Sequence, residues 1–195
     1  MSKPKCAVLV IDMLRDFVGK DAKDSVKSPR ADAIIPNVYK LLSRAYETGI
    51  PIFYCSDAHF LSDHELKIWG EHAMAGTRGA EVIPELRLPE EGRNKYWFDM
   101  PKHTYSGFVG TPLDMILRDL GIDTLVISGL HTHICDRHTT ADAWALGYKI
   151  VVPKDCVETF TEDAQKSGLE YLTQVYSAKI TTVEELVKEF KESDK

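Results

Sequence analysis

The sequence predicts an α/β fold, in which helices pack on both faces of a parallel sheet. Short apolar runs rich in β-branched residues alternate with amphipathic helical patterns along the chain. These runs end at polar or glycine residues, as buried parallel strands do. The chain has 195 residues, of which 44% are hydrophobic and 28% charged, an ordinary composition for a soluble protein. We therefore expect a single domain that spans residues 1–195.

The first half of the chain contains three expected strands and one long helix. The strands are expected at 6–11, 50–55 and 95–98. Pro36 opens the helix, and Gly49 ends it. Residues 58–92 show only weak periodicity. A segment of this length inside a compact domain is usually either functional or disordered.

The second half continues the alternation and closes the sheet. Strands are expected at 123–128, 148–152 and 178–181, and helices at 113–120, 135–146 and 161–176. Thr111 and Pro112 provide the start of the first of these helices, and Val175 is expected on the buried face of the third. A capping box over 182–185 opens a last helix. The predicted sheet has six strands.

Composition and charge exclude several classes of protein. The net charge is −6, and no basic segment carries interleaved aromatic residues, so neither nucleic acid nor an anionic membrane is expected as a partner. The apolar stretch at the N-terminus is too short for a secretory signal, and no run reaches membrane-spanning length. The cysteines are far apart in sequence and form no CxxC pair: Cys6, Cys55, Cys135 and Cys156. A disulfide framework or zinc–thiolate site is therefore not expected, and a cytoplasmic location is.

Four residues able to carry out chemistry follow the first four expected strands. They are Asp12, Asp57, Lys102 and Cys135. Parallel sheets bind ligands beyond the carboxyl ends of their strands, at the point where the strand order reverses. In a doubly wound order of 3-2-1-4-5-6, strands one and four are neighbours at that point. We therefore expect Asp12 and Cys135 to face each other across a crevice.

Cys135 is the candidate nucleophile, because it lies where a buried strand passes into a helix. The helix dipole at that position lowers the pKa of a thiol and makes it more nucleophilic. Asp12 would accept the thiol proton, and Lys102 would hold the charged forms of both partners. Backbone N–H groups of residues 130–134 would then face a developing oxyanion. The alternatives are that Cys135 fills apolar space, Asp12 caps a turn and Lys102 is solvated.

The histidines supply a second candidate site. All seven lie between positions 59 and 138. Asp57 and His59 at the end of a strand, with His72 on the returning segment, form a credible carboxylate–imidazole metal site. His64 is a candidate for an additional ligand. The alternative is a loop that ordinary histidine hydrogen bonds stabilise.

Together these motifs resemble the isochorismatase-like cysteine hydrolase superfamily, and within it the metal-bearing nicotinamidase/pyrazinamidase branch. The matching segments are AVLVIDMLRDF, SDAH, WGEHAMAGTRGAEV, KHTYSGFVGT, SGLHTHICDRHTTADA and VVPKDCVE. They occur in order over nearly the whole chain. The superfamily's isochorismate-cleaving members lack the nucleophilic cysteine, so Cys135 argues against that chemistry here.

The resemblance implies a three-layer α/β/α domain of the isochorismatase-like hydrolase fold, with homo-oligomeric assembly. It implies a catalytic triad of Asp12, Lys102 and Cys135, and a divalent, zinc-like metal on Asp57, His59 and His72. It also implies a cis peptide between Leu130 and His131, with an oxyanion hole made by the backbone N–H groups of His131 and Cys135. Substrate-binding positions are expected at Phe17, Trp69, Tyr105 and Leu130.

The expected substrate is a small amide, from which the enzyme releases ammonia through a thioester on Cys135. Departures from the nicotinamidase pattern affect the pocket rather than the triad: Leu14, Ala58, Phe60, Ala73, His131 and His133 replace the usual residues. Two alternatives therefore stay open. One is a related cysteine amidohydrolase that acts on a carbamoyl or ureido compound. The other is a non-catalytic, redox-sensing binding protein on the same fold.

Overall fold

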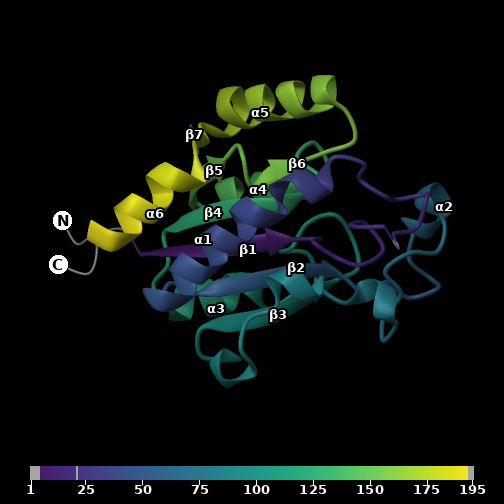
Figure 1. Cartoon of the computed structure of the whole chain (residues 1–195), viewed down its shortest axis with the longest axis horizontal. Coiled ribbons are helices and arrows are strands. Elements are labelled where there is room, and N and C mark those ends of the chain that lie inside the picture. Colours follow the sequence, from purple (N-terminus) through teal and green to yellow (C-terminus); the bar gives the residue numbers. More distant parts are fainter. Residues whose placement is uncertain (1–4, 21, 193–195) are drawn as a thin grey trace.

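A computed structural model describes residues 5–20 and 22–192 of the chain (Figure 1). The strands of this part are β1 (Cys6–Ile11), β2 (Ile52–Asp57), β3 (Trp97–Lys102), β4 (Thr124–Leu130), β5 (Lys149–Pro153), β6 (Val157–Glu158) and β7 (Lys179–Thr181). They form one parallel sheet in the order β3-β2-β1-β4-β5-β7, and β6 pairs with β4 beside this path. The predicted strand order is confirmed, with β7 in the place expected for the last strand.

The helices are α1 (Ile35–Glu47), α2 (Leu66–Trp69), α3 (Leu113–Asp119), α4 (Cys135–Ala145), α5 (Glu162–Tyr176) and α6 (Val183–Glu192). Short 3-10 turns lie at Ala31–Ile34, Arg78–Ala80, Pro84–Leu86 and Glu90–Gly92. The Thr161 hydroxyl caps α5 by accepting the N–H of Ala164 at 3.2 Å. The capping box before α6 is confirmed, because the Glu185 carboxylate accepts the N–H of Thr182 at 3.1 Å.

The helices divide into two layers, because successive side chains of a strand point to opposite faces of the sheet. Val8 and Val10 of β1 join the core cluster that includes the apolar sides of α1 and α6. Leu9 and Ile11 join the cluster that includes residues of α3, α4 and α5. Figure 1 shows α1 and α6 on the near face of the sheet. The result is the predicted three-layer α/β/α arrangement.

The structure differs from the prediction in the number of strands, in the bounds of β3 and in the burial of Val175. The sheet of the described chain has a seventh strand, β6, which has only two residues and leaves no periodicity to detect. Strand β3 begins at Trp97 because the N–H of Tyr96 still bonds the carbonyl of Gly92, at 2.7 Å. It continues through Pro101, as an edge strand can, since its outer side needs no N–H donor. Val175 on α5 is 44% exposed rather than buried.

The strand order reverses between β1 and β4 (the switch point), and the close approach of these two strands there depends on Gly129. This residue pairs with Ile11 and has a φ of +114°, a conformation that favours glycine. A Cβ atom at this position would lie 2.0 Å from the carbonyl oxygen of Ile11. The two central strands can therefore run side by side up to the residues that follow them, Asp12 and His131. None of the helices in the described ranges is both long and apolar enough to cross a membrane.

Candidate active site

A buried lysine links the ends of β1, β2 and β3. Lys102 ends β3 in register with Asp57, the last residue of β2. Its Nζ atom lies 2.5 Å from Asp57 Oδ1 and 2.8 Å from Asp12 Oδ2. The other oxygen of Asp12 accepts the backbone N–H of Asp57 at 2.8 Å. Parallel pairing thus brings three charges, all at most 2% exposed, into one cluster.

Cys135 joins this cluster from the other side of the switch point. It is the first residue of α4 and is 5% exposed. Its Sγ atom and one oxygen from each of Asp12 and Asp57 lie within 4.8 Å of one another. The structure therefore brings together the three residues of the expected triad, Asp12, Lys102 and Cys135.

The electrostatics of the cluster keep the thiol protonated. Burial, followed by the nearby carboxylates, raises the pKa of the Cys135 thiol well above its ordinary value, although Lys102 opposes this. The direction of this shift is opposite to the lowering expected from the helix dipole. Burial and the charge of Asp57 raise the pKa of Asp12, which makes it a stronger base.

Lys102 stays charged within this cluster. Burial alone would lower its pKa, but the charges of Asp12 and Asp57 raise the value well above the ordinary one. In return, Lys102 holds the pKa of Asp57 below its usual range in spite of burial. A thiol, a base and a fixed cation at these distances can transfer a proton while the sulfur attacks a carbonyl.

The turn before α4 has the backbone that the family resemblance implies. The peptide between Leu130 and His131 is cis. The N–H groups of His131 and Cys135 take part in none of the turn and loop hydrogen bonds among the described residues. Both are therefore available to an oxyanion. The Leu130 side chain is fully buried in the core cluster beside α1, and Leu130 is not among the residues that line the cavity, so its contact with substrate stays a prediction.

Asp57, His59 and His72 form the cluster predicted to hold a metal. One donor atom from each lies within 4.8 Å of the others, and all three residues are buried. Hydrogen bonds orient both rings: His59 Nδ1 lies 3.0 Å from Asp63 Oδ2, and His72 Nδ1 lies 2.8 Å from the carbonyl of Gly70.

When Nδ1 donates, Nε2 presents its lone pair, the form in which histidine binds metals. His59 Nε2 is buried and has no hydrogen-bond partner within the described ranges. Its distance from Asp57 Oδ2 is 3.6 Å. One carboxylate oxygen and two imidazole nitrogens fit a divalent ion of the zinc type, with positions left open for other ligands.

His64 does not belong to this cluster. It is exposed, and the residue beside it, Glu65, turns inward instead. Glu65 is 7% exposed, and its Oε2 atom has no hydrogen-bond partner in the described chain. Burial and the charge of Asp57 raise its pKa to about 7. Glu65 was not predicted as a site residue, although an acidic residue between His59 and His72 in sequence could have suggested one.

A cavity opens in front of Cys135 and contains about 290 Å³ of empty space, part of it open to solvent. The expected residues Phe17, Trp69 and Tyr105 all line it, together with Asp57, Glu65, His72, Cys135 and others. The indole N–H of Trp69 donates to the Tyr105 hydroxyl at 3.2 Å. The expected substrate-pocket residues Phe17, Trp69 and Tyr105 therefore surround the space in front of the thiol.

Two further aromatic rings of the cavity wall were not predicted. Phe160, which follows β6, stacks on the side chain of His131 with centroids 4.2 Å apart. Phe160 also lies against Trp69, at 6.0 Å. No periodic pattern marks Phe160, and His131 was predicted only for its backbone. Four aromatic side chains and the two histidines His72 and His131 thus surround the space beside the thiol.

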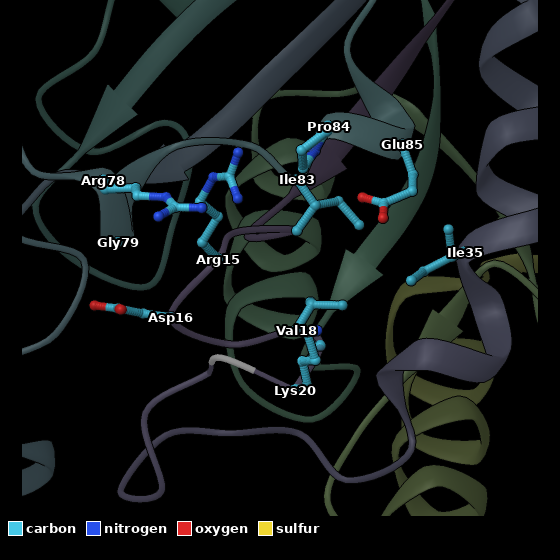
Figure 2. Close-up of a pocket in the computed structure, with 11 residues that line it drawn as sticks. Arg15, Asp16, Val18, Lys20, Ile35, Arg78, Gly79, Ile83, Pro84 and Glu85 are labelled. Carbon is cyan, nitrogen blue, oxygen red and sulfur yellow. The ribbon is translucent and has the colours of Figure 1, made fainter.

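A larger hollow is lined in part by the loop that follows β1 (Figure 2). Figure 2 shows Arg78 on one side of it and Glu85 and Ile35 on the other. None of the triad or the metal cluster lines this hollow. Asp16, at its edge, accepts the N–H of Ala73 at 2.8 Å and so anchors the residue after His72. Of the triad and the metal cluster, Cys135, Asp57 and His72 instead line the smaller cavity.

Comparison with known proteins gives consistent matches. A family model described as "Isochorismatase domain" matches residues 6–185. The N-carbamoylsarcosine amidase of Thermoplasma acidophilum is 39% identical, with a TM-score of 0.81 over 92% of this chain and 96% of that one. The pyrazinamidase/nicotinamidase of Streptococcus mutans is 34% identical, with a TM-score of 0.84 over 90% and 99%. A pyrazinamidase of Pyrococcus horikoshii, solved in complex with zinc, is 29% identical, with a TM-score of 0.80 over 92% and 99%.

Proposed function

The chain belongs to the isochorismatase family of hydrolases, and from this premise we propose that it is a cysteine amidohydrolase that releases ammonia from a small, uncharged ring carboxamide. The main support for the proposal is the cluster of Asp12, Lys102 and Cys135, in which Cys135 lines an aromatic cavity. A base, a buried cation and a thiol are the groups that nucleophilic acyl transfer needs.

The first half of the reaction forms a thioester. As Cys135 Sγ attacks the amide carbon, its proton passes to the Asp12 carboxylate. The N–H groups of His131 and Cys135 donate hydrogen bonds to the oxyanion. Asp12 then protonates the amide nitrogen, the carbon–nitrogen bond breaks, and ammonia leaves.

The second half restores the enzyme. Asp12 takes a proton from a water molecule, which attacks the thioester carbon. The carbon–sulfur bond breaks, the carboxylic acid product forms, and the Asp12 proton returns to Cys135. Lys102 stays protonated throughout, since two carboxylates surround it, and it keeps Asp12 within reach of the sulfur.

Asp57, His59 and His72 would hold a divalent metal, with zinc favoured by the donor set and by the zinc in the Pyrococcus horikoshii relative. When bound, such an ion supplies a Lewis acid beside the cavity, to which a donor atom of the substrate can be directed. Asp63 and the carbonyl of Gly70 keep the two rings oriented for this role.

The lining of the cavity favours a neutral substrate. No lysine or arginine of the described chain lines it, and two carboxylates neutralise Lys102 below. A substrate carboxylate would therefore lose its hydration with no lysine or arginine side chain to pair with it, and only a metal held by Asp57, His59 and His72 would offset its charge. The aromatic walls suit a flat ring. This argues for a ring carboxamide over an acidic ureido compound, the alternative to which the amidase of Thermoplasma acidophilum points.

A redox-sensing role is disfavoured, because sensor thiols are exposed and have a low pKa. Cys135 is buried, and its pKa is raised.

The test is to trap the thioester. Protein quenched with acid during turnover of nicotinamide should carry the acyl group on the peptide that contains Cys135, as detected by mass spectrometry. Cys135→Ala should show neither adduct nor ammonia release, whereas Cys156→Ala, at a buried cysteine outside the cavity, should keep both. Full activity in Cys135→Ala would refute the proposal.

A further inference from the structure

His131 is buried in the wall of the cavity. It is 4% exposed and, like Cys135, is one of the residues that line the cavity. Phe160 covers one face of the ring at 4.2 Å with an interplanar angle of 26°, and Phe17 meets it edge to face at 5.9 Å. These contacts fix the ring plane and leave the ring edge to carry any polar interaction.

The polar edge of this ring has no partner in the protein. His131 Nε2 is buried and makes no hydrogen bond to any described residue. Leaving such an atom unpaired is unfavourable, so buried nitrogens are normally paired. His133, two residues later, shows the usual outcome: its Nδ1 lies 2.7 Å from the Thr159 hydroxyl. His133 does not line the cavity.

We propose that His131 is a specificity-determining residue, whose Nε2 atom hydrogen-bonds a ring heteroatom of the bound carboxamide, in addition to any heteroatom directed to the metal site. This inference rests on the proposed function and deepens it. The chemical class of substrate is a flat ring amide with a second nitrogen in the ring plane, such as a diazine carboxamide. A neutral imidazole can offer either a donor or an acceptor at Nε2. Burial lowers the pKa of His131 to about 3, which is consistent with a neutral ring.

Two small amides test this role directly. Pyrazinamide and nicotinamide differ by one ring atom, a nitrogen in place of a CH group. In His131→Phe the ring that stacks on Phe160 is kept, but both ring nitrogens are lost. We expect the ratio of kcat/KM for pyrazinamide to that for nicotinamide to fall by about 3- to 10-fold relative to wild type, the loss of one net hydrogen bond. His131→Gln, which can place a polar atom near the position of Nε2, should recover part of the ratio.

The matched control is His133→Phe, which makes the same change outside the cavity lining and should keep the wild-type ratio. Thermal unfolding of each variant shows whether the fold is intact. An unchanged ratio in folded, active His131→Phe would overturn the role of His131 and leave the proposed function standing. If zinc-loaded wild type hydrolysed neither amide, the proposed function would fail, and this inference with it.

Discussion

The cluster around Lys102 and the wall of the cavity differ in whether their buried polar groups have partners within the protein. Lys102 contacts the carboxylates of Asp12 and Asp57 at 2.8 and 2.5 Å, so its charge is balanced on both sides. In the cavity wall, Glu65 Oε2 and His131 Nε2 are buried without a hydrogen-bond partner among the described residues. The protein pairs the first set itself, whereas the second set, in the wall of the cavity, has no partner in the described chain. The paired charges around Lys102 hold the proposed triad in place, whereas Glu65 and His131 offer unpaired atoms where a ligand would lie.

Asp12→Asn should have the largest effect, because it removes the proton acceptor while it keeps the shape of the side chain. We expect kcat/KM for the amide to fall by about 10⁴-fold, as for other residues that act as one unit with a nucleophile. Steady-state ammonia release measures this. Asp16→Asn, whose carboxylate anchors Ala73 outside the triad, should lose far less. Equal losses in the two variants would remove the distinction between the triad and its surroundings.

Lys102→Met should break the paired cluster. The variant leaves two buried carboxylates without their shared cation, which should lower the free energy of unfolding by about 3–5 kcal/mol. Chemical denaturation measures the change. Lys149→Met is the control, since Lys149 is exposed and lies 3.9 Å from Asp123 in a surface pair. A Lys102 variant as stable as the control would show that this cluster does not depend on charge pairing.

The metal cluster allows the same contrast between a supporting residue and an exposed neighbour. Asp63→Asn weakens the hydrogen bond that orients His59, so zinc affinity should fall by about 10- to 100-fold. His64→Ala, one residue away and exposed, should bind zinc as wild type does. Competition with a chromophoric chelator gives both affinities. A loss of zinc in the His64 variant would instead place that residue among the ligands.

Glu65→Gln should have the smallest effect, and it should raise the free energy of unfolding rather than lower it. Above pH 4.5 the carboxyl ionises in the unfolded chain, whereas in the folded protein it keeps its proton until about pH 7. The folded state is therefore destabilised as pH rises through this window, and the penalty is complete above pH 7. In chelator, the variant should gain about 1–3 kcal/mol over wild type at pH 8 and little at pH 4. A gain that does not depend on pH would contradict this origin.

The sequence was sufficient for the residues whose position follows from the sheet. In a parallel sheet, residues after neighbouring strands meet at one edge, so Asp12, Asp57, Lys102 and Cys135 could be placed together in advance. Gly129 could be read as a break in a strand, but not as the point where β4 approaches the Ile11 carbonyl. That closeness depends on the pairing of two strands that are more than a hundred residues apart in sequence.

The rest of the site depends on the paths of loops, which periodicity does not specify. Glu65 and His64 are adjacent, and the start of α2 decides which of them faces the cavity. Leu130 was expected among the substrate-binding residues from the family resemblance. In β4 its side chain instead packs in the core beside α1. Phe160 follows β6, which pairs with β4 through two residues. A pairing this short leaves no periodic pattern in the sequence, so the position of Phe160 could not be predicted.

The most direct test of the account is ammonia release from nicotinamide by the purified wild-type protein, measured before chelation, after chelation and after zinc is added back. We expect ammonia release that is lost on chelation and restored by zinc. Zinc-loaded Cys135→Ala should release no ammonia. Release that persists after complete metal removal, or no release by zinc-loaded wild-type protein, would contradict it.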